Sequence, residues 1–361
     1  MLKKIAIIGT VGLPSNYGGF ETLTEYLTKY LGDKFDFTVF CSSKSYNKKI
    51  KTYNNAKLKY LPLNANGIQS IFYDILSIFY ALFFADVLLI LGVSGCVFLP
   101  LVKLISSKKI IVNIDGLEWK RQKWNKVAKR FLKFSEVCAV KYANVIIADN
   151  KVIKDYVYSN YKKNAHLIAY GGDHCNLKKQ SYELLKKFPF LEKKYAFKVC
   201  RIEPENNIEI ILEAFAQADK IPLVLIGNWN NSTFGKQIKS KYQDFETIYL
   251  LDPIYDQDVL NGIRSNCEFY IHGHSAGGTN PSLVEAMSLG LPILCYDINY
   301  NDETTENSAL YFKSSLDLIN LIKSISQEEI KLIGNRMYDI ARNKYKWSII
   351  SNQYMELFEK Y

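Results

Sequence analysis

Short apolar runs, separated by polar or glycine-containing segments, recur along the whole chain of 361 residues. Runs such as KKIAIIG and DVLLIL are too short for a buried helix and are typical of strands inside a parallel sheet. In the first half such runs predict strands over residues 3–9, 35–42, 58–63, 86–91, 108–115 and 143–150. Between the first two, residues 21–31 place apolar side chains at helical spacing. Strands alternating with helices predict a doubly wound parallel sheet.

The same alternation restarts after residues 166–173, a run with a glycine pair that resembles a strand leading into a hinge. Strands are then predicted over residues 196–202, 222–228, 247–254, 267–273 and 291–297. Helices are predicted over residues 206–218 and 281–290, and the chain reads as helical from residue 326 onwards. We therefore expect two α/β domains in series, over residues 1–170 and 174–346.

The segment over residues 71–105 is almost entirely apolar, which raises the question of a membrane span. A span needs about 20 apolar residues without strong breaks. Here the apolar run is interrupted by Asp74, Asp86, Gly92, Gly95 and Pro100. A helix over 70–84, a strand over 87–91 and a helix over 96–106 therefore explain it better, as the buried middle of the first domain.

Composition fits a folded protein with an anionic partner. The chain is 48% hydrophobic and 23% charged, and its net charge is +10. This charge favours a nucleotide, a phospholipid surface or a nucleic acid as partner. The seven cysteines form no Cys-x-x-Cys pair, and no signal peptide is recognisable, so we expect free thiols in a reducing cytoplasm.

One predicted helix in the second half has the signature of an anion site. Asn280 suits the N-cap, Pro281 the first helical position and Gly290 the residue after the C-cap. The helix start is preceded by Gly277 and Gly278, which would leave room for a diphosphate. Glu285, one turn inside, could bind ribose hydroxyls. An ordinary capped helix is the alternative.

Arg201 ends the predicted strand over 196–202, and Pro204 opens the next helix. The carboxyl ends of strands in an open α/β sheet point into the usual ligand crevice. An arginine there suits a pair of anionic oxygens. A surface salt bridge with Glu203 or Glu205 would explain it equally well.

Taken in order, these segments resemble the retaining glycosyltransferases of family 4, which have the GT-B fold. The stretch IGTVGLPSNYGGFETLTEYL and the stretch NIDGLEWKRQKW at residues 113–124 resemble more closely a subgroup of bacterial enzymes that build capsule or O-antigen polysaccharide, including rhamnosyltransferases. The resemblance covers essentially the whole chain. It implies two Rossmann-like domains facing a central cleft: an N-terminal acceptor domain (1–170), with a C-terminal helix over 347–361 packing back on it, and a C-terminal donor domain (174–346).

The resemblance also implies roles for individual residues. Gly18 and Gly19 correspond to a glycine pair whose backbone approaches the donor phosphate or the transferred sugar. Arg201 corresponds to the arginine on the donor diphosphate, and Glu285 to the carboxylate on the ribose. The helix start at the diphosphate corresponds to Gly278, Asn280, Pro281, Ser282 and Leu283. Glu21 and Tyr170 are expected to line the cleft, although Tyr170 also suits a plain hinge.

The sequence departs from the family pattern at three places. Gly277 stands where the family has a carboxylate on the donor sugar, and Asn206 stands where it has a lysine near Arg201. A histidine usual in the first domain is replaced around Asp115. The candidate acid, base or sugar-binding groups are therefore Asp115, Glu118 and Asp149, each of which could instead be a loop cap or salt-bridge partner.

The histidines and acidic pairs do not predict a metal site. His272 and His274 lie two residues apart with no nearby carboxylate or cysteine set, so His274 is a candidate donor contact or a satisfied turn histidine. The motif Asp256-Gln257-Asp258 begins a predicted helix, and capping explains it. We expect no metal and no cofactor besides the nucleotide-sugar substrate.

The stretch from Lys120 to Lys133 carries seven lysines or arginines and no acid. On one helical side would lie Trp124, Val127, Phe131 and Phe134. This pattern suits a helix on an anionic membrane surface, and equally a basic helix whose apolar side is in the core.

We therefore predict a hexosyl- or deoxyhexosyltransferase, with rhamnosyl among the candidate groups. It would use a dTDP- or UDP-sugar and a lipid-linked saccharide acceptor, with retention of the anomeric configuration, in the cytoplasm or on the inner face of the membrane. No nucleic-acid partner is expected. A non-catalytic nucleotide or membrane binder of the same fold is the alternative. A dinucleotide-dependent oxidoreductase would need Gly-x-Gly-x-x-Gly and an acid ending the second strand, and neither is present.

Overall fold

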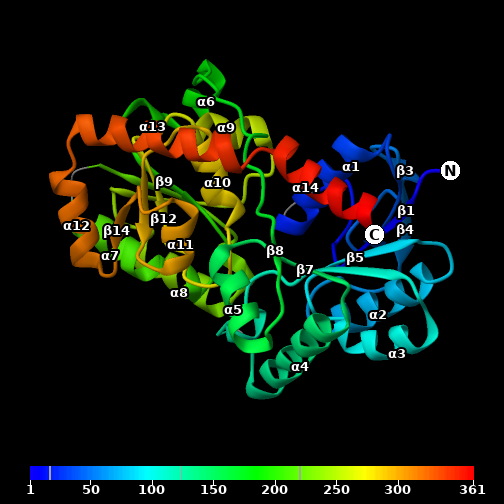
Figure 1. Ribbon diagram of the computed structural model, residues 1–361. Helices are drawn as coiled ribbons and strands as arrows, with labels where there is room; N and C mark the ends of the chain where they lie inside the picture. Colours follow the sequence, from blue (N-terminus) through cyan, green and yellow to red (C-terminus); the bar gives the residue numbers. More distant parts are fainter. Residues whose placement is uncertain (16–17, 123, 219–220) are drawn as a thin grey trace. The chain divides into compact units, whose positions relative to one another are not determined.

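The computed structural model describes residues 1–15, 18–122, 124–218 and 221–361. The chain divides into two compact units (Figure 1). Unit 1 comprises Met1–Tyr170 and Trp347–Tyr361, and unit 2 comprises Gly171–Lys346. Each unit contains one twisted sheet with helices packed on it, as the alternation of apolar runs predicts.

Unit 1 is built on a sheet with the strand order β3-β4-β2-β1-β5-β6-β7-β8. Its strands are β1 (Lys4–Ile8), β2 (Asp36–Ser42), β3 (Thr52–Tyr53), β4 (Ala56–Leu61), β5 (Val87–Leu91), β6 (Lys109–Asn113), β7 (Val145–Ala148) and β8 (His166–Leu167). Neighbouring strands pair in parallel, except β3 with β4. The carboxyl ends of β1, β6 and β7 therefore meet at one edge of the sheet, where Thr10, Asp115 and Asp149 follow them.

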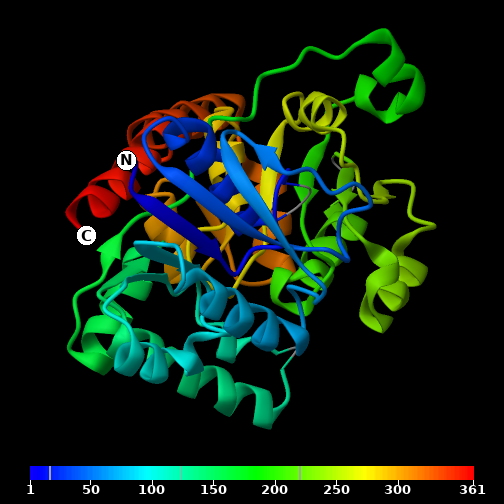
Figure 2. The same ribbon diagram turned by 90° about the vertical axis from the view of Figure 1, so that its right-hand side faces the viewer.

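The helices of unit 1 cover both faces of this sheet. They are α1 (Gly19–Leu31), α2 (Gln69–Ala81), α3 (Leu99–Ile105), α4 (Lys126–Tyr142), α5 (Lys151–Tyr161) and α14 (Trp347–Lys360). The C-terminal helix α14 packs against α1, where the rings of Tyr26 and Trp347 stack with centroids 4.6 Å apart. Figure 1 and Figure 2 show α2, α3 and α4 side by side on the opposite face.

Unit 2 contains a six-stranded sheet with the order β11-β10-β9-β12-β13-β14, and each neighbouring pair is parallel. The strands are β9 (Ala196–Val199), β10 (Leu223–Ile226), β11 (Ile248–Leu251), β12 (Phe269–His272), β13 (Ile293–Tyr296) and β14 (Leu310–Phe312). The helices are α6 (Tyr182–Lys187), α7 (Ile208–Ala218), α8 (Thr233–Tyr242), α9 (Gln257–Arg264), α10 (Pro281–Ser288), α11 (Asn299–Thr304), α12 (Ser315–Ser324) and α13 (Gln327–Lys344). A buried apolar cluster joins α7 and α12 to the sheet.

The elements expected within residues 71–105 are present, but their expected burial is wrong in part. Helix α2, strand β5 and helix α3 lie where the pattern predicts them, and β5 is fully buried. The outward sides of α2 and α3 are nevertheless exposed and apolar, with Phe72 and Leu104 among the exposed side chains. Among the described residues, no helix combines the length and the apolar character needed to cross a membrane.

Two other expectations need adjustment. The strand expected over 166–173 is only two residues long, because β8 ends at Leu167 and the remainder is a loop. The basic stretch is not one helix, since Glu118–Lys120 is a 3₁₀ turn and α4 begins only at Lys126, capped by Asn125. Lys123 of this stretch lies outside the described residues, as do Asn16 and Tyr17 before the glycine pair.

Candidate functional site

In unit 2, the start of α10 has the capping predicted from its sequence. The Asn280 side chain accepts hydrogen bonds from the Ser282 backbone N–H at 3.0 Å and from the Ser282 hydroxyl at 2.8 Å. Pro281 occupies the first helical position, and Gly290 after the C-cap has a φ of +67°. Tyr270, on β12, donates to the Ser282 hydroxyl at 3.0 Å. The helix start is therefore fixed to the neighbouring strand, with Gly278 two residues before the cap and Leu283 buried behind it.

Hydrogen bonds join the loops that follow β9 and β12, which are neighbours in the sheet. Asn206 Oδ1 lies 3.1 Å from His274 Nδ1, and Asn206 Nδ2 donates to the Arg201 carbonyl at 2.8 Å. The Ser275 backbone N–H donates to the Glu205 carbonyl at 2.8 Å. These bonds bring the predicted donor residues Arg201, Asn206 and His274 together at the carboxyl edge of the sheet.

Asn206 and Arg201 differ in burial and in contacts. Asn206 is buried and serves as a cross-link between the two loops, where the family pattern would place a lysine. The side chain of Arg201 is exposed. His272, one strand position before the loop, is 2% exposed, and burial lowers its pKa well below the usual value, as do Lys198 and His274. The imidazole of His272 is therefore neutral.

Glu285 belongs to a network of ion pairs that was not predicted from the sequence. Its Oε2 lies 2.8 Å from Arg264 Nη2, and its Oε1 lies 3.3 Å from His174 Nε2. Arg264, at the end of α9, is 2% exposed and also donates from Nη1 to the Cys175 sulfur at 2.8 Å. Burial alone would raise the pKa of Glu285, but Arg264 and His174 outweigh burial and lower it. Glu285 is therefore a carboxylate held in one orientation.

The same three side chains raise the question of a metal ion. His174, Cys175 and Glu285 offer ligand atoms within 4.8 Å of one another. The Arg264 guanidinium already contacts two of these ligands, Cys175 and Glu285, and supplies positive charge to them. A second cation at this place would be repelled, so the residues as arranged do not fit a metal ion.

The ion pair of His174 predicts how unit 2 responds to pH. Burial lowers the pKa of His174, but hydrogen bonds with Cys175 and Glu285 raise it by more than burial lowers it. The net effect raises the pKa from 6.5 to about 10. A group whose pKa is raised on folding stabilises the fold below its unfolded pKa and loses that contribution as the pH rises through the folded value. The stability advantage of wild type over His174→Gln should therefore shrink by about 4 kcal/mol between pH 6.5 and 10. Urea unfolding at several pH values measures this, and a constant advantage would contradict it.

In unit 1, Glu21 closes the loop after β1. Its Oε1 accepts from the Thr10 hydroxyl at 3.1 Å and from the Val11 backbone N–H at 2.7 Å, and the side chain is 7% exposed. Gly18 has a φ of +129°, a backbone conformation that residues with a side chain rarely adopt, and a Cβ built on it would meet the Glu21 carboxylate. The backbone conformation by itself therefore favours glycine at residue 18, before any ligand is considered. Gly19 is the first residue of α1.

Acidic groups from two loops and from helix α1 of unit 1 act on one buried phenol, Tyr170. Tyr170 is 3% exposed; burial raises its pKa well above the usual value, and the negative charges of Asp115, Asp149 and Glu21 raise it further. Asp149 is buried at the end of β7. Asp115 follows β6 in a left-handed conformation, with a φ of +59°. The structure thus brings four of the predicted residues into electrostatic contact.

Glu118 has different partners. Its carboxylate pairs with Arg121 Nε at 2.9 Å and accepts from Trp124 Nε1 at 2.9 Å. These contacts brace the loop that follows Asp115, in agreement with the salt-bridge alternative stated for this residue. These two contacts of Glu118 support a structural role.

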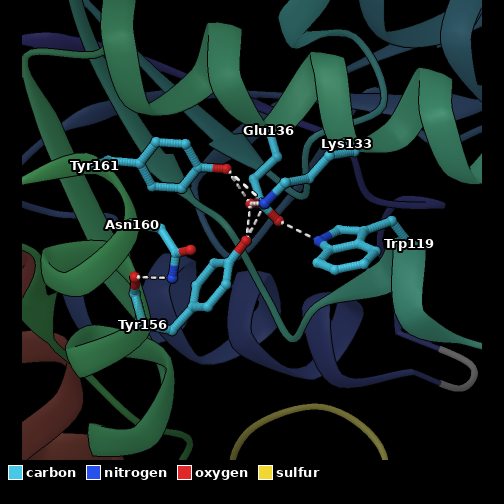
Figure 3. Close-up of polar contacts among 6 residues, drawn as sticks. All are labelled: Trp119, Lys133, Glu136, Tyr156, Asn160 and Tyr161. Atoms are coloured by element: carbon cyan, nitrogen blue, oxygen red, sulfur yellow. Dashed lines mark hydrogen bonds and ion pairs between the residues drawn. The ribbon is translucent and has the colours of Figure 1, made fainter.

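A buried carboxylate behind the same loop was missed from the sequence. Glu136, on α4, is 3% exposed and accepts hydrogen bonds from Trp119 Nε1 at 2.9 Å and from Tyr156 at 2.7 Å (Figure 3). Tyr161 and Lys133 donate to the same carboxylate. The Lys133 ammonium lies 4.7 Å from the Trp119 ring centroid. Lys133 is therefore paired with Glu136 and packed against Trp119, with 35% of its side chain exposed.

Removing the charge of Glu136 should destabilise unit 1. In Glu136→Gln the amide NH₂ would face donors where the carboxylate accepted several hydrogen bonds. We expect a loss of about 2–3 kcal/mol in unfolding free energy, measured by urea denaturation.

The matched control is Asp155→Asn, the same chemical change in unit 1. Asp155 pairs with Lys151 at 3.6 Å, and the two side chains are 62% and 60% exposed. This control should cost at most about 0.5 kcal/mol. Equal costs for the two variants would contradict a special role for Glu136.

Comparison with known proteins links each unit to a family description. Residues 180–347 match the family model described as glycosyl transferases group 1. Residues 2–173 match a model described as a domain of unknown function, DUF1972. A Xenopus tropicalis protein, glycosyltransferase 1 domain-containing protein 1, is 24% identical over 168 residues, which are 44% of this chain and 48% of that protein. The match thus spans about half the length of this curated relative.

Solved structures resemble the chain along its whole length. Sucrose-phosphate synthase from Thermosynechococcus elongatus has a TM-score of 0.84 at 15% identity, covering 99% of this chain and 98% of its own. HepE of Anabaena, solved in complex with UDP-glucose, has a TM-score of 0.79 at 14% identity, with full coverage of both chains. At such identities the likeness concerns the fold. The chain therefore has the GT-B fold, and residues 180–347, just under half of its length, match the glycosyl transferases group 1 model.

Proposed function

We propose that the protein transfers a hexosyl or deoxyhexosyl group from a nucleotide-diphosphate sugar to a lipid-linked saccharide. The observation that carries the proposal is the edge of the unit 2 sheet, where Arg201, the joined loops and the capped start of α10 come together. An exposed guanidinium and a helix N-terminus each suit a diphosphate. Structures of HepE contain UDP or UDP-glucose, which favours a nucleotide-sugar donor here as well.

The donor would be held by unit 2. Arg201 would bind the diphosphate, together with the helix start formed by Gly278, Asn280, Pro281, Ser282 and Leu283. Glu285 would accept hydrogen bonds from the ribose hydroxyls, for which its fixed and ionised carboxylate is well suited. Asn206 and His274 would act mainly by holding the two loops in register.

The acceptor would be held by unit 1. Gly18 and Gly19 would approach the transferred sugar, and Glu21 would keep their loop in place. Asp149 and Asp115 are the candidates to orient or deprotonate the acceptor hydroxyl, beside Tyr170. The contacts of Glu118 make it the weakest of the three catalytic candidates.

The reaction would break the bond between the anomeric carbon and the diphosphate oxygen and form a bond to the acceptor oxygen. The resemblance to family 4 favours retention, with a leaving-group oxygen assisting attack from the same face. Stabilising the departing diphosphate would be the protein's main contribution, without a metal ion. Resemblance also supports a rhamnosyl group and a role in capsule or O-antigen synthesis. The exposed part of the stretch from Lys120 to Lys133 would contact an anionic membrane.

A nucleotide-binding screen tests the donor site directly. Ligands that bind the folded state raise the melting temperature. UDP, dTDP and GDP are tested beside NAD, and at least one nucleoside diphosphate should stabilise the protein while NAD does not. Stabilisation by NAD alone, or by no nucleotide, would contradict the proposal.

A further inference from the structure

The outward sides of α2, α3 and α4 expose apolar side chains on one side of unit 1, called here the α2–α3–α4 face. Its most exposed members include Ile68, Phe72, Phe83, Leu104, Val127 and Phe134. The three helices lie side by side on one face of the sheet (Figure 1 and Figure 2). Helices α3 and α4 contact each other, and Gly95, just before α3, packs against Asp74 of α2.

Helix α2 shows most clearly that this surface needs a partner. A helix on the surface of a protein in water normally turns polar side chains outward. Of the charged residues α2 has only Asp74, which is 4% exposed. Its outward side instead carries Phe72, 62% exposed, and the chain continues to Phe83, 73% exposed. Exposed aromatic side chains in a contiguous group mark a surface that binds something.

The exposed charged side chains of the three helices are of one sign. Across α2, α3 and α4, all of whose residues the structure describes, the acidic residues are Asp74 and Glu136, and both are buried. On α4 the outward side alternates apolar and cationic residues: Val127, Arg130, Phe134, Val137 and Lys141. Lys126 is also exposed. The face therefore combines aromatic and aliphatic side chains with cations and exposes no acidic side chain.

We infer that the α2–α3–α4 face docks on an anionic lipid bilayer. Apolar side chains can enter the boundary between headgroups and acyl chains, while lysines and arginines contact the lipid phosphates. A second copy of the chain fits less well, because it would bring the same cations against one another without acidic partners. The inference uses unit 1 alone, and it stands whether or not the chain transfers sugar.

Vesicle sedimentation tests the inference without any nucleotide sugar. Purified full-length protein is mixed at low salt with vesicles of phosphatidylcholine and phosphatidylglycerol, or of phosphatidylcholine alone. The protein should sediment with the anionic vesicles and less with the neutral ones. Binding should weaken about tenfold or more in Phe72→Gln/Phe83→Gln, which removes two exposed rings without opening the core. Lys126→Gln/Arg130→Gln should weaken binding to anionic vesicles by a similar factor.

The matched control is Leu177→Gln/Tyr182→Gln. Both residues are in unit 2 and comparably exposed, at 70% and 77%, so this variant should bind vesicles like wild type. Circular dichroism melting establishes that each variant is folded. Failure of the wild type to bind anionic vesicles would overturn the inference, as would unchanged binding of Phe72→Gln/Phe83→Gln. A dimer that forms without lipid and is lost in this variant would assign the face to a second copy and overturn it as well.

Discussion

Arg201→Ala is expected to lower turnover by about 10²–10³-fold while leaving the melting temperature unchanged. The side chain of Arg201 is exposed, and the fold uses its backbone carbonyl, which accepts from Asn206 at 2.8 Å. Truncation to alanine keeps that carbonyl, so the joined loops should persist. The proposed loss is the positive charge that faces the departing diphosphate. Steady-state rates with a saturating donor measure the effect.

The matched control for this variant is Arg336→Ala, which removes another exposed arginine of unit 2, in α13. It should retain the rate of wild type, so that a general change in net charge is excluded as the cause. A wild-type rate in Arg201→Ala would contradict the assignment of Arg201 to the diphosphate site.

Arg264→Met should be the most destabilising single substitution proposed for unit 2. It removes a buried cation that contacts Glu285 at 2.8 Å and Cys175 at 2.8 Å. Breaking a buried ion pair by removing one partner leaves the other charge uncompensated and costs about 3–5 kcal/mol. Urea unfolding should register this loss. The affinity for the nucleotide should fall too, because Glu285 would lose the contact that holds its carboxylate in place.

Two further variants show whether the loss of stability in Arg264→Met comes from the burial of Arg264 and from its pairing with Glu285. Arg342→Met makes the same change at an exposed arginine of α13 and should alter stability by less than about 0.5 kcal/mol. The double variant Arg264→Met/Glu285→Met removes both charges and should regain much of the lost stability. It should not regain nucleotide affinity, because the proposed ribose contact is gone. Additive losses in the double variant would show that the two residues are not coupled.

Most of the strands could be predicted because a buried parallel strand needs a short apolar run and little else. The run 87–91 became β5 without adjustment, and the capping residues Asn280 and Pro281 began α10 as expected. Element ends were less predictable. The strand expected over 166–173 stops after two residues, since pairing with β7 supplies partners only for His166 and Leu167.

The burial of α2 could not be predicted because the helix is apolar around most of its circumference. Spacing identifies the buried side of a helix only when the other side is polar. Here Tyr73 and Ile78 face the core while Phe72 and Phe79 face outward, and the sequence gives both sides the same character.

The candidate site was predictable where one segment defines a residue's surroundings. Asn280 and Ser282 are neighbours in sequence, so their capping bonds follow from local rules. The partners of Glu285 come from distant segments: Arg264 ends α9, and His174 lies in the loop after β8. No local pattern relates these three residues. The role of Asn206 as a link between two loops likewise depends on the pairing of β9 with β12.

The most direct test of the central claim is a donor screen with purified protein and a membrane lipid extract. dTDP-rhamnose and the common UDP- and GDP-sugars are supplied in turn, and labelled lipid product is measured. The account predicts transfer to lipid from one of these donors, which would identify the sugar at the same time. No transfer from any donor, with no stabilisation by any nucleotide, would contradict it and favour a non-catalytic binding protein.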